Sequence, residues 1–220
     1  MSINIYVYWG PRNETIDDLV LRTQSHFRTL SDSDERLSRW APLGRSLKKA
    51  VASEKVDISS AEVLRSWLLK GQNKTDVVPR QPIPELGYHL SFWNQRLGNL
   101  EASTSIYCGA FSEYLSSDSQ NNASLELNYL EEVGIKSDLL INIFCNLLEI
   151  WNPIWGAVWK YAPNGHPNGI PSDTSKIQLA FYQQIADLGP KNRLIGREQH
   201  VGSGGSVWIN NQVAHLLERN

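Results

Sequence analysis

The first forty residues constrain the fold more than any other segment of the chain. Residues 3–8 form a short run of β-branched and aromatic side chains that is typical of a strand, and the Gly-Pro pair after it indicates a turn. Thr15 and Asp18 have the spacing of a capping box, and apolar residues then recur at helical spacing. The segment therefore predicts a strand, a turn and a helix over roughly residues 15–30, and none of these carries a pattern of reactive groups.

Two more helices are expected from capping and periodicity. Ser59 and Glu62 have the spacing of a second capping box, for a helix over roughly residues 60–70 that ends with Gly71 in a left-handed conformation. A broad apolar face predicts a third helix over residues 138–151.

The remaining segments are mostly strands and turns. Strands are expected at residues 88–93, 100–111, 123–130 and 156–161, with a β-pair inside 194–209 and a short helix over 211–218. Residues 31–35 are loop-like, and residues 45–52 fit either a helix or a strand. Because the first three of these strands have short connections, an antiparallel meander is favoured. The pattern predicts an α+β fold, with a mainly antiparallel sheet packed by several helices in a single domain over residues 1–220.

Composition and segment chemistry indicate a globular protein of the cytoplasm. Hydrophobic residues make up 41% of the 220 residues and charged residues 20%, which is typical of a chain that folds alone. The start of the chain lacks the basic and apolar regions of a secretory signal, and polar residues interrupt the apolar segment 139–155, so no membrane span is expected. Cys108 and Cys145 are too few for a disulfide framework, and we expect both to be reduced and buried.

Charge is unevenly distributed between the two halves of the chain. Residues 1–110 carry 14 Lys/Arg against 12 Asp/Glu, whereas residues 111–220 carry 7 against 11. The basic residues do not cluster as they would for neutralising several phosphates, so direct nucleic-acid binding is not expected. An acidic second half suits a basic protein partner better.

Motifs for catalysis, metals or cofactors find little support. The glycine-rich stretch 202–206 lacks the Lys-Ser/Thr of a phosphate-binding loop and is better interpreted as a hairpin turn. The acidic turn that begins at Asp32 has Leu37 where a calcium loop needs glycine, and the five histidines show no zinc spacing. Cys108 is a formal candidate nucleophile, although a small buried thiol is the favoured interpretation. We therefore expect no metal, no cofactor and no catalytic residue.

Eight tryptophans are an unusually large number for this length and raise a second possibility. Exposed aromatic rings can bind sugars or protein partners, but most of these residues fall on predicted helix stripes or strands and are expected to pack in the core. Trp155, at the corner after the long helix, is the best exposed candidate. A non-catalytic carbohydrate- or peptide-binding module is therefore one alternative function, and a hydrolase that uses Cys108 or a histidine is another.

Several short motifs remain once catalytic patterns are set aside. They are Tyr8-Trp9-Gly10-Pro11-Arg12, Trp40 before Gly44-Arg45-Ser46, Trp151-Asn152-Pro153-Ile154-Trp155, and the glycine-rich turn before Val207-Trp208-Ile209. This arrangement resembles the immunity protein 52 family of bacterial polymorphic toxin systems. The resemblance implies an α+β cytosolic antidote, encoded beside a toxin and neutralising it by direct binding. It also implies a toxin with a restriction-endonuclease-like nuclease domain, often delivered by a type VI secretion system, and it supplies no catalytic residues.

The resemblance separates structural residues from candidates for toxin binding. We expect a structural role for the signature residues Trp9, Gly10, Pro11, Arg12, Trp40, Trp151 and Pro153, in which the Gly-Pro pair shapes the turn, Trp9 fills core and Arg12 braces a carboxylate. A nuclease site grips phosphate with basic groups, so an acidic face could steer association and block it. The candidates for toxin binding are Asp32, Asp34, Glu35, Glu131, Glu132 and Trp155. Residues 73–130 match no motif, and partner-specific contacts could lie there.

Overall fold

The computed structural model describes residues 2–43, 47–96, 100–111, 121–128, 137–153, 155–161 and 206–209. Their strands form one antiparallel sheet in the order β2-β3-β4-β5-β1-β6-β7. The strands are β1 (Ser2–Tyr8), β2 (Ala41–Pro42), β3 (Leu86–Trp93), β4 (Glu101–Ala110), β5 (Asn122–Asn128), β6 (Trp155–Tyr161) and β7 (Ser206–Ile209). The first strand of the chain therefore lies inside the sheet, between β5 and β6.

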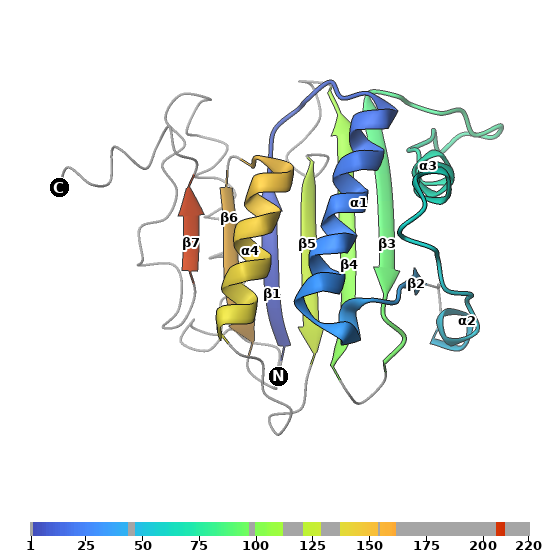
Figure 1. The fold of residues 1–220 in the computed structure, drawn as a ribbon. Helices are drawn as coiled ribbons and strands as arrows, with labels where there is room; N and C mark the ends of the chain where they lie inside the picture. Colours follow the sequence, from blue (N-terminus) through green and yellow to red (C-terminus); the bar gives the residue numbers. More distant parts are fainter. Residues whose placement is uncertain are drawn as a thin grey trace, which may run out of the picture.

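The helices complete an α+β fold. They are α1 (Ile16–Ser33), α2 (Leu47–Val51), α3 (Ala61–Lys70) and α4 (Ser137–Trp151), with a short 3-10 helix η1 (Glu35–Leu37) after α1. Figure 1 shows α1 and α4 side by side across the same face of the sheet, with α3 beyond α1. The predicted fold class, its three main helices and the meander of β3, β4 and β5 are confirmed.

Alternation along the strands explains why the helices cover that face. In β5, Ala123, Leu125 and Leu127 are buried, whereas the polar residues between them are only half-buried. Successive side chains of a strand point to opposite faces, so one face of β5 is apolar and the other polar. The core forms where the apolar face meets the buried side chains of α1 and α4, which include Leu19, Val20, Phe27, Ile143, Phe144 and Leu147.

Helix α1 begins as predicted but ends later. The Thr15 side chain accepts a hydrogen bond from the Asp18 amide, and the Asp18 carboxylate accepts from the Thr15 amide, so the capping box is confirmed. The loop-like interpretation of residues 31–35 is wrong for Ser31–Ser33, which continue α1, and for Glu35, which begins η1. The helix extends this far because the Asp34 amide still donates to the Leu30 carbonyl and closes the last turn. The helix ends at Asp34, where the backbone turns extended.

Helix α3 differs from its prediction at both ends. Ser60, not Ser59, caps its start by accepting a hydrogen bond from the Val63 amide, while Ser59 instead bonds to Asp57. Gly71 ends the helix with φ of −81° and is not left-handed. Glycine is still required there, because an added Cβ would lie 2.2 Å from the carbonyl oxygen of His89 in β3.

Three other expectations are settled only where the described residues reach them. The open choice for residues 45–52 resolves as a helix over Leu47–Val51 (α2), whereas residues 45 and 46 lie outside the described residues. The β-pair expected within 194–209 is seen only in its second arm, β7, which pairs with β6; its first arm and the helix expected over 211–218 lie outside the described residues.

The two cysteines differ in burial. Cys108 is buried in β4, but Cys145 is exposed, so the prediction of burial is wrong for Cys145. Cys145 lies one turn after Ile141 on α4, and helical spacing turns both away from the sheet. No helix in the described part of the chain combines the length and the apolar character needed to cross a membrane.

Candidate functional site

Two of the signature tryptophans stack on each other at the junction of β1 and α4. Trp9 follows β1 and Trp151 is the last residue of α4, and their ring centroids are 4.7 Å apart with planes only 15° from parallel. Both side chains are almost completely buried. The amide of Trp9 donates to the backbone oxygen of Asn121, which precedes β5. This stack therefore joins the start of the chain to the end of its last described helix.

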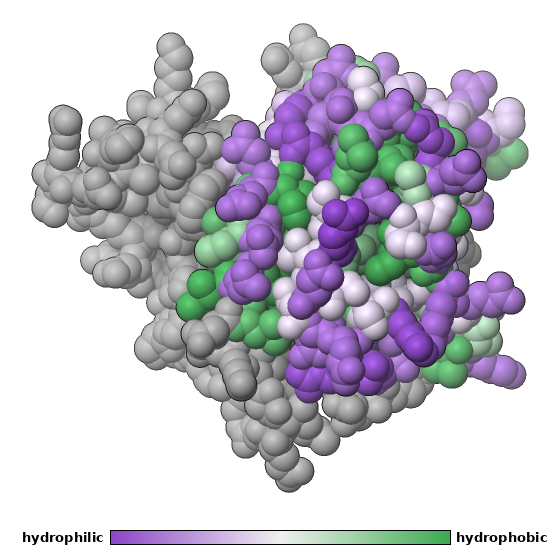
Figure 2. Space-filling view, viewed as in Figure 1, coloured by the Kyte–Doolittle hydropathy of each residue, from purple (hydrophilic) through white to green (hydrophobic). Residues whose placement is uncertain are grey.

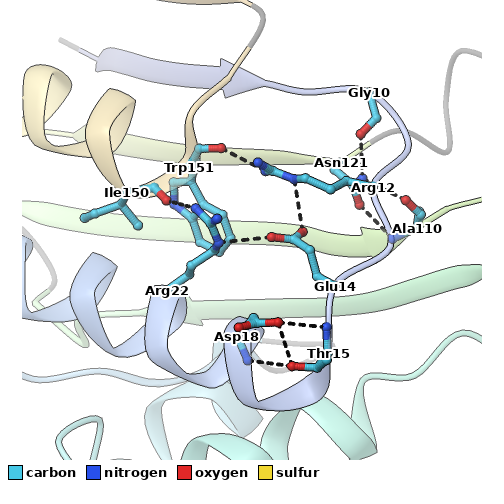
Figure 3. A network of polar contacts seen from close by, with 10 residues as sticks. All are labelled: Gly10, Arg12, Glu14, Thr15, Asp18, Arg22, Ala110, Asn121, Ile150 and Trp151. Carbon is cyan, nitrogen blue, oxygen red and sulfur yellow. Dashed lines mark hydrogen bonds and ion pairs between the residues drawn. The ribbon is translucent and has the colours of Figure 1, made fainter.

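Two arginines then bond the end of α4. Arg12 donates from Nη2 to the carbonyl oxygen of Trp151 at 2.8 Å, and Arg22 donates from Nη1 to that of Ile150 (Figure 3). The last carbonyls of a helix have no partner within it and carry the negative end of the helix dipole, so cations there are stabilising. Helix α4 has no basic residue in its own last turn. Arg12 and Arg22 supply that charge from elsewhere in the chain.

Glu14 lies between the two arginines and holds them in place. Its carboxylate oxygens are 3.4 Å from Arg12 Nε and 3.0 Å from Arg22 Nε, and its side chain is only 5% exposed. Burial raises the pKa of Glu14, while the two guanidinium groups oppose that shift. Arg12 also lies over the Trp9 ring, 5.5 Å from its centroid. The carboxylate that Arg12 contacts is therefore Glu14, two residues away.

Asn121 fixes the turn on the other side of Trp9. Its side-chain amide donates to the carbonyl oxygens of Gly10 and Ala110, both at 2.9 Å, and its side-chain oxygen accepts from the Ala110 amide at 2.8 Å (Figure 3). The Arg12 amide donates to the same Ala110 carbonyl. Asn121 is fully buried, and these bonds satisfy its polar atoms.

His26 connects the helices to the sheet from within the core. Trp151 Nε1 donates to His26 Nδ1 at 3.1 Å, which leaves Nε2 to carry the proton and donate to Thr104 Oγ1 at 3.1 Å. Thr104 Oγ1 in turn donates to the Ser124 carbonyl at 2.7 Å. Complete burial lowers the pKa of His26 to about 3, so the ring is neutral at pH 7.

The described residues hold no arrangement typical of catalysis. Burial, with a smaller effect of Glu14, raises the pKa of the Cys108 thiol, which also lies in the core, so the structure argues against this candidate nucleophile. Within the described ranges, no group of three or more His, Cys, Asp or Glu side chains could hold a metal ion. The polar contacts around Trp9 and Trp151 join secondary-structure elements.

Three of the six candidates for toxin binding have side chains among the described residues. Asp32 and Glu35 are exposed at the end of α1. Asp34 lies between them but is paired with Arg36, whose Nη2 and Nε donate to its carboxylate at 2.6 and 2.9 Å and hold the pKa of Asp34 below its usual range. Glu131, Glu132 and the side chain of Trp155 lie outside the described residues.

The tryptophans described with side chains are not open platforms. Trp40 is fully buried, and its Nε1 donates to the Leu37 carbonyl at 2.7 Å. Trp93 is also buried, and Trp67 is half-buried against Phe92. The sugar- or peptide-binding alternative therefore finds no support from these rings or from the stacked pair.

Pro153 is buried just after α4, and Asn152 before it adopts a positive φ of 42°, which ends the helix.

Comparison with known families identifies the class of protein. Residues 4–171, about three quarters of the chain, match the family described as Immunity protein 52. The chain therefore belongs to the Immunity protein 52 family, which confirms the resemblance and supports a role in neutralising a toxin. The matched range includes the stacked tryptophans and the arginines at the end of α4. A search of curated proteins found no match to this sequence.

Replacement of Glu14 by glutamine should destabilise the protein. The change leaves Arg12 and Arg22 facing each other without a carboxylate, and we expect the free energy of unfolding to fall by about 1–3 kcal/mol. Urea denaturation measures it. The control is Asp17→Asn, which removes the exposed partner of Arg65 and should cost under about 1 kcal/mol. Equal losses in the two variants would contradict a central role for Glu14.

His26 should make stability depend on pH. The unfolded chain binds a proton on this ring near pH 6.5, whereas the folded chain does so only near pH 3, so stability is lost as pH falls from about 6.5 towards about 3. The His26 contribution to this loss between pH 7.5 and 5 is on the order of 2 kcal/mol. His26→Gln cannot titrate, so its unfolding free energy should vary less over that range. Parallel curves for the two proteins would disprove this assignment.

Proposed function

We propose that the protein is a non-catalytic inhibitor that binds and neutralises a cognate toxin in the bacterial cytoplasm. The observation that carries this proposal is the family match over residues 4–171. We further propose that the toxin is a restriction-endonuclease-like nuclease effector of a polymorphic toxin system, delivered by type VI secretion, and that residues 1–220 act as one domain.

The geometry of the core supports an inhibitor. Arg12, Glu14, Arg22 and His26 have charges or ring nitrogens that could serve chemistry, yet each is engaged with another part of the fold. An inhibitor of this kind needs a surface that keeps its shape on binding, because ordering loops and side chains would reduce affinity. The contacts between β1, α1 and α4 provide that support.

Coexpression with the toxin is the direct test of this function. The protein encoded by the adjacent gene should arrest growth when produced alone in a bacterial cytoplasm, and this chain should restore growth and copurify with it. Loss of chromosomal DNA in the arrested cells would identify a nuclease. Failure to protect or to bind would overturn the inhibitor function, whereas protection against a toxin that leaves nucleic acid intact would overturn only the nuclease assignment.

Acidic residues at the end of α1 should contribute to binding a basic nuclease site. Of the proposed set of Asp32, Asp34, Glu35, Glu131, Glu132 and Trp155, we select Asp32 and Glu35, because both are exposed and the charge of Asp34 is already paired. The double change Asp32→Lys and Glu35→Lys should raise the Kd for the toxin at least tenfold at low salt, and the loss should shrink as salt screens the charges. Binding can be measured by calorimetry.

The matched control makes the same change of charge elsewhere. Glu54 and Glu62 are also exposed, and neither lies at the end of α1. Glu54→Lys with Glu62→Lys should leave the Kd within about threefold, since single rim charges contribute little at a distance. An unchanged Kd in the Asp32 and Glu35 variant would remove both residues from the binding surface.

A further inference from the structure

The connection between α3 and β3 is a braced projection, which we call the finger and define as residues 71–87. Its two arms are joined by hydrogen bonds from the amides of Asn73 to Gly87 O (3.0 Å), Ile83 to Asn73 O (2.8 Å), Thr75 to Gln81 O (2.8 Å) and Gln81 to Thr75 Oγ1 (3.0 Å). Figure 1 shows it leaving the sheet near the start of α1 and extending past α3. The bonds reach up to Thr75 and Gln81, so only residues 76–80 form the apex.

The base of the finger is tied to the sheet. The His89 amide donates to the Gly71 carbonyl at 2.8 Å, and the Phe111 amide donates to the Glu85 carbonyl at 3.1 Å. The Asn73 side chain adds a bond of 2.6 Å to the Leu86 carbonyl. Pro79, Pro82 and Pro84 further restrict the backbone. These bonds and prolines restrict the base and the two arms of the finger, which carry the apex.

Two adjacent valines form the apex. Val77 is 75% exposed and Val78 is 85% exposed, which makes them the most exposed large hydrophobic side chains among the described residues. Other exposed apolar residues, such as Leu21 and Ile141, are single positions on helices, and Figure 2 shows the hydrophobic groups of the helix-covered face broken up by hydrophilic ones. Scattered single residues are ordinary, but a braced apolar apex is not explained by packing.

The chemistry of the finger selects the kind of partner. Lys74 and Arg80 balance Asp76 and Glu85, so the finger carries no net charge. It also contains no aromatic residue. A phosphate backbone would require clustered basic groups, and a lipid surface would favour basic and aromatic ones. A convex, neutral and apolar apex instead fits an apolar pocket on a protein, with the flanking charges at the polar rim.

We infer that the finger inserts Val77 and Val78 into an apolar pocket of the toxin and anchors the complex. This inference rests on the proposed function and names a contact that the acidic residues do not provide. The finger leaves the sheet near the N-terminus of α1, whereas Asp32 and Glu35 lie at its C-terminus (Figure 1). A few well-packed apolar side chains usually dominate the binding energy of an interface, and a preorganised loop loses less entropy when it binds.

The test replaces both valines and compares an apolar control. Val77→Ser with Val78→Ser should raise the Kd for the inactivated toxin encoded by the adjacent gene at least tenfold, which corresponds to about 1.4 kcal/mol. Val77→Thr with Val78→Thr keeps the shape of the side chains and should weaken binding in the same direction. The control, Leu21→Ser with Ile141→Ser, removes two exposed apolar side chains from α1 and α4 and should leave the Kd within about threefold. Unfolding curves should stay close to wild type for all three variants.

The outcomes distinguish failure of the proposed anchor from failure of the proposed inhibitor function. If the wild-type chain does not bind the toxin, the proposed function fails and the anchor fails with it. If the wild-type chain binds and the serine variant binds equally well, or the control loses as much affinity, only the anchor is overturned. Sedimentation tests whether Val77 and Val78 instead contact a second copy of this chain. If the wild-type chain self-associates, the serine variant does not, and the affinity for the toxin is unchanged, the anchor is also overturned.

Discussion

The junction between the end of β1 and the end of α4 is the contact on which the rest of the structure depends. Trp9 and Trp151 stack there, and Arg12 and Arg22 bond the last carbonyls of α4. Because β1 lies inside the sheet, this junction sets where α4 crosses it. Helix α4 then covers β1 and β6 while α1 packs beside it, so the apolar faces of both helices meet the same side of the sheet.

The charged group of Glu14 and the amide of Asn121 can be buried at the junction because each has specific partners. An unpaired buried charge or amide would cost several times what a hydrogen bond contributes, so groups such as Glu14 and Asn121 restrict the fold to an arrangement in which their partners are present. His26 adds a neutral ring that links α4, α1 and β4 through a chain of hydrogen bonds. This buried network favours one packing of the helices, and a surface held in one shape suits a protein that acts by binding.

The residues that hold the fold together differ from the residues proposed to bind the toxin. The signature tryptophans and Arg12 lie in or against the core, where their role is to hold the fold. The two surfaces proposed for binding differ in chemistry: Asp32 and Glu35 offer negative charge at one end of α1, and Val77 and Val78 offer apolar contact near the other. Charge speeds encounter and sets orientation, whereas burial of apolar groups mainly lengthens the life of the complex.

Local features could be predicted from the sequence because they depend on residues a few positions apart. The capping box of Thr15 and Asp18, the end of α4 before Pro153 and the alternation of β5 are of this kind. Local spacing does not distinguish Ser59 from Ser60 as the residue that caps α3, and the need for glycine at Gly71 comes from its contact with β3, which local sequence does not show. Three pairings could not be predicted: Glu14 with Arg22, Asn121 with Gly10, and His26 with Trp151. The partners of Asn121 and His26 are more than a hundred residues away in the sequence. The contact of Glu14 depends on how the turn after β1 meets α1. The sequence by itself determined the three main helices, most of the strands, the α+β class and the family. Only the tertiary structure decided which polar side chains meet and which apolar ones, at the apex of the finger, are left in water, since both depend on where distant segments come together.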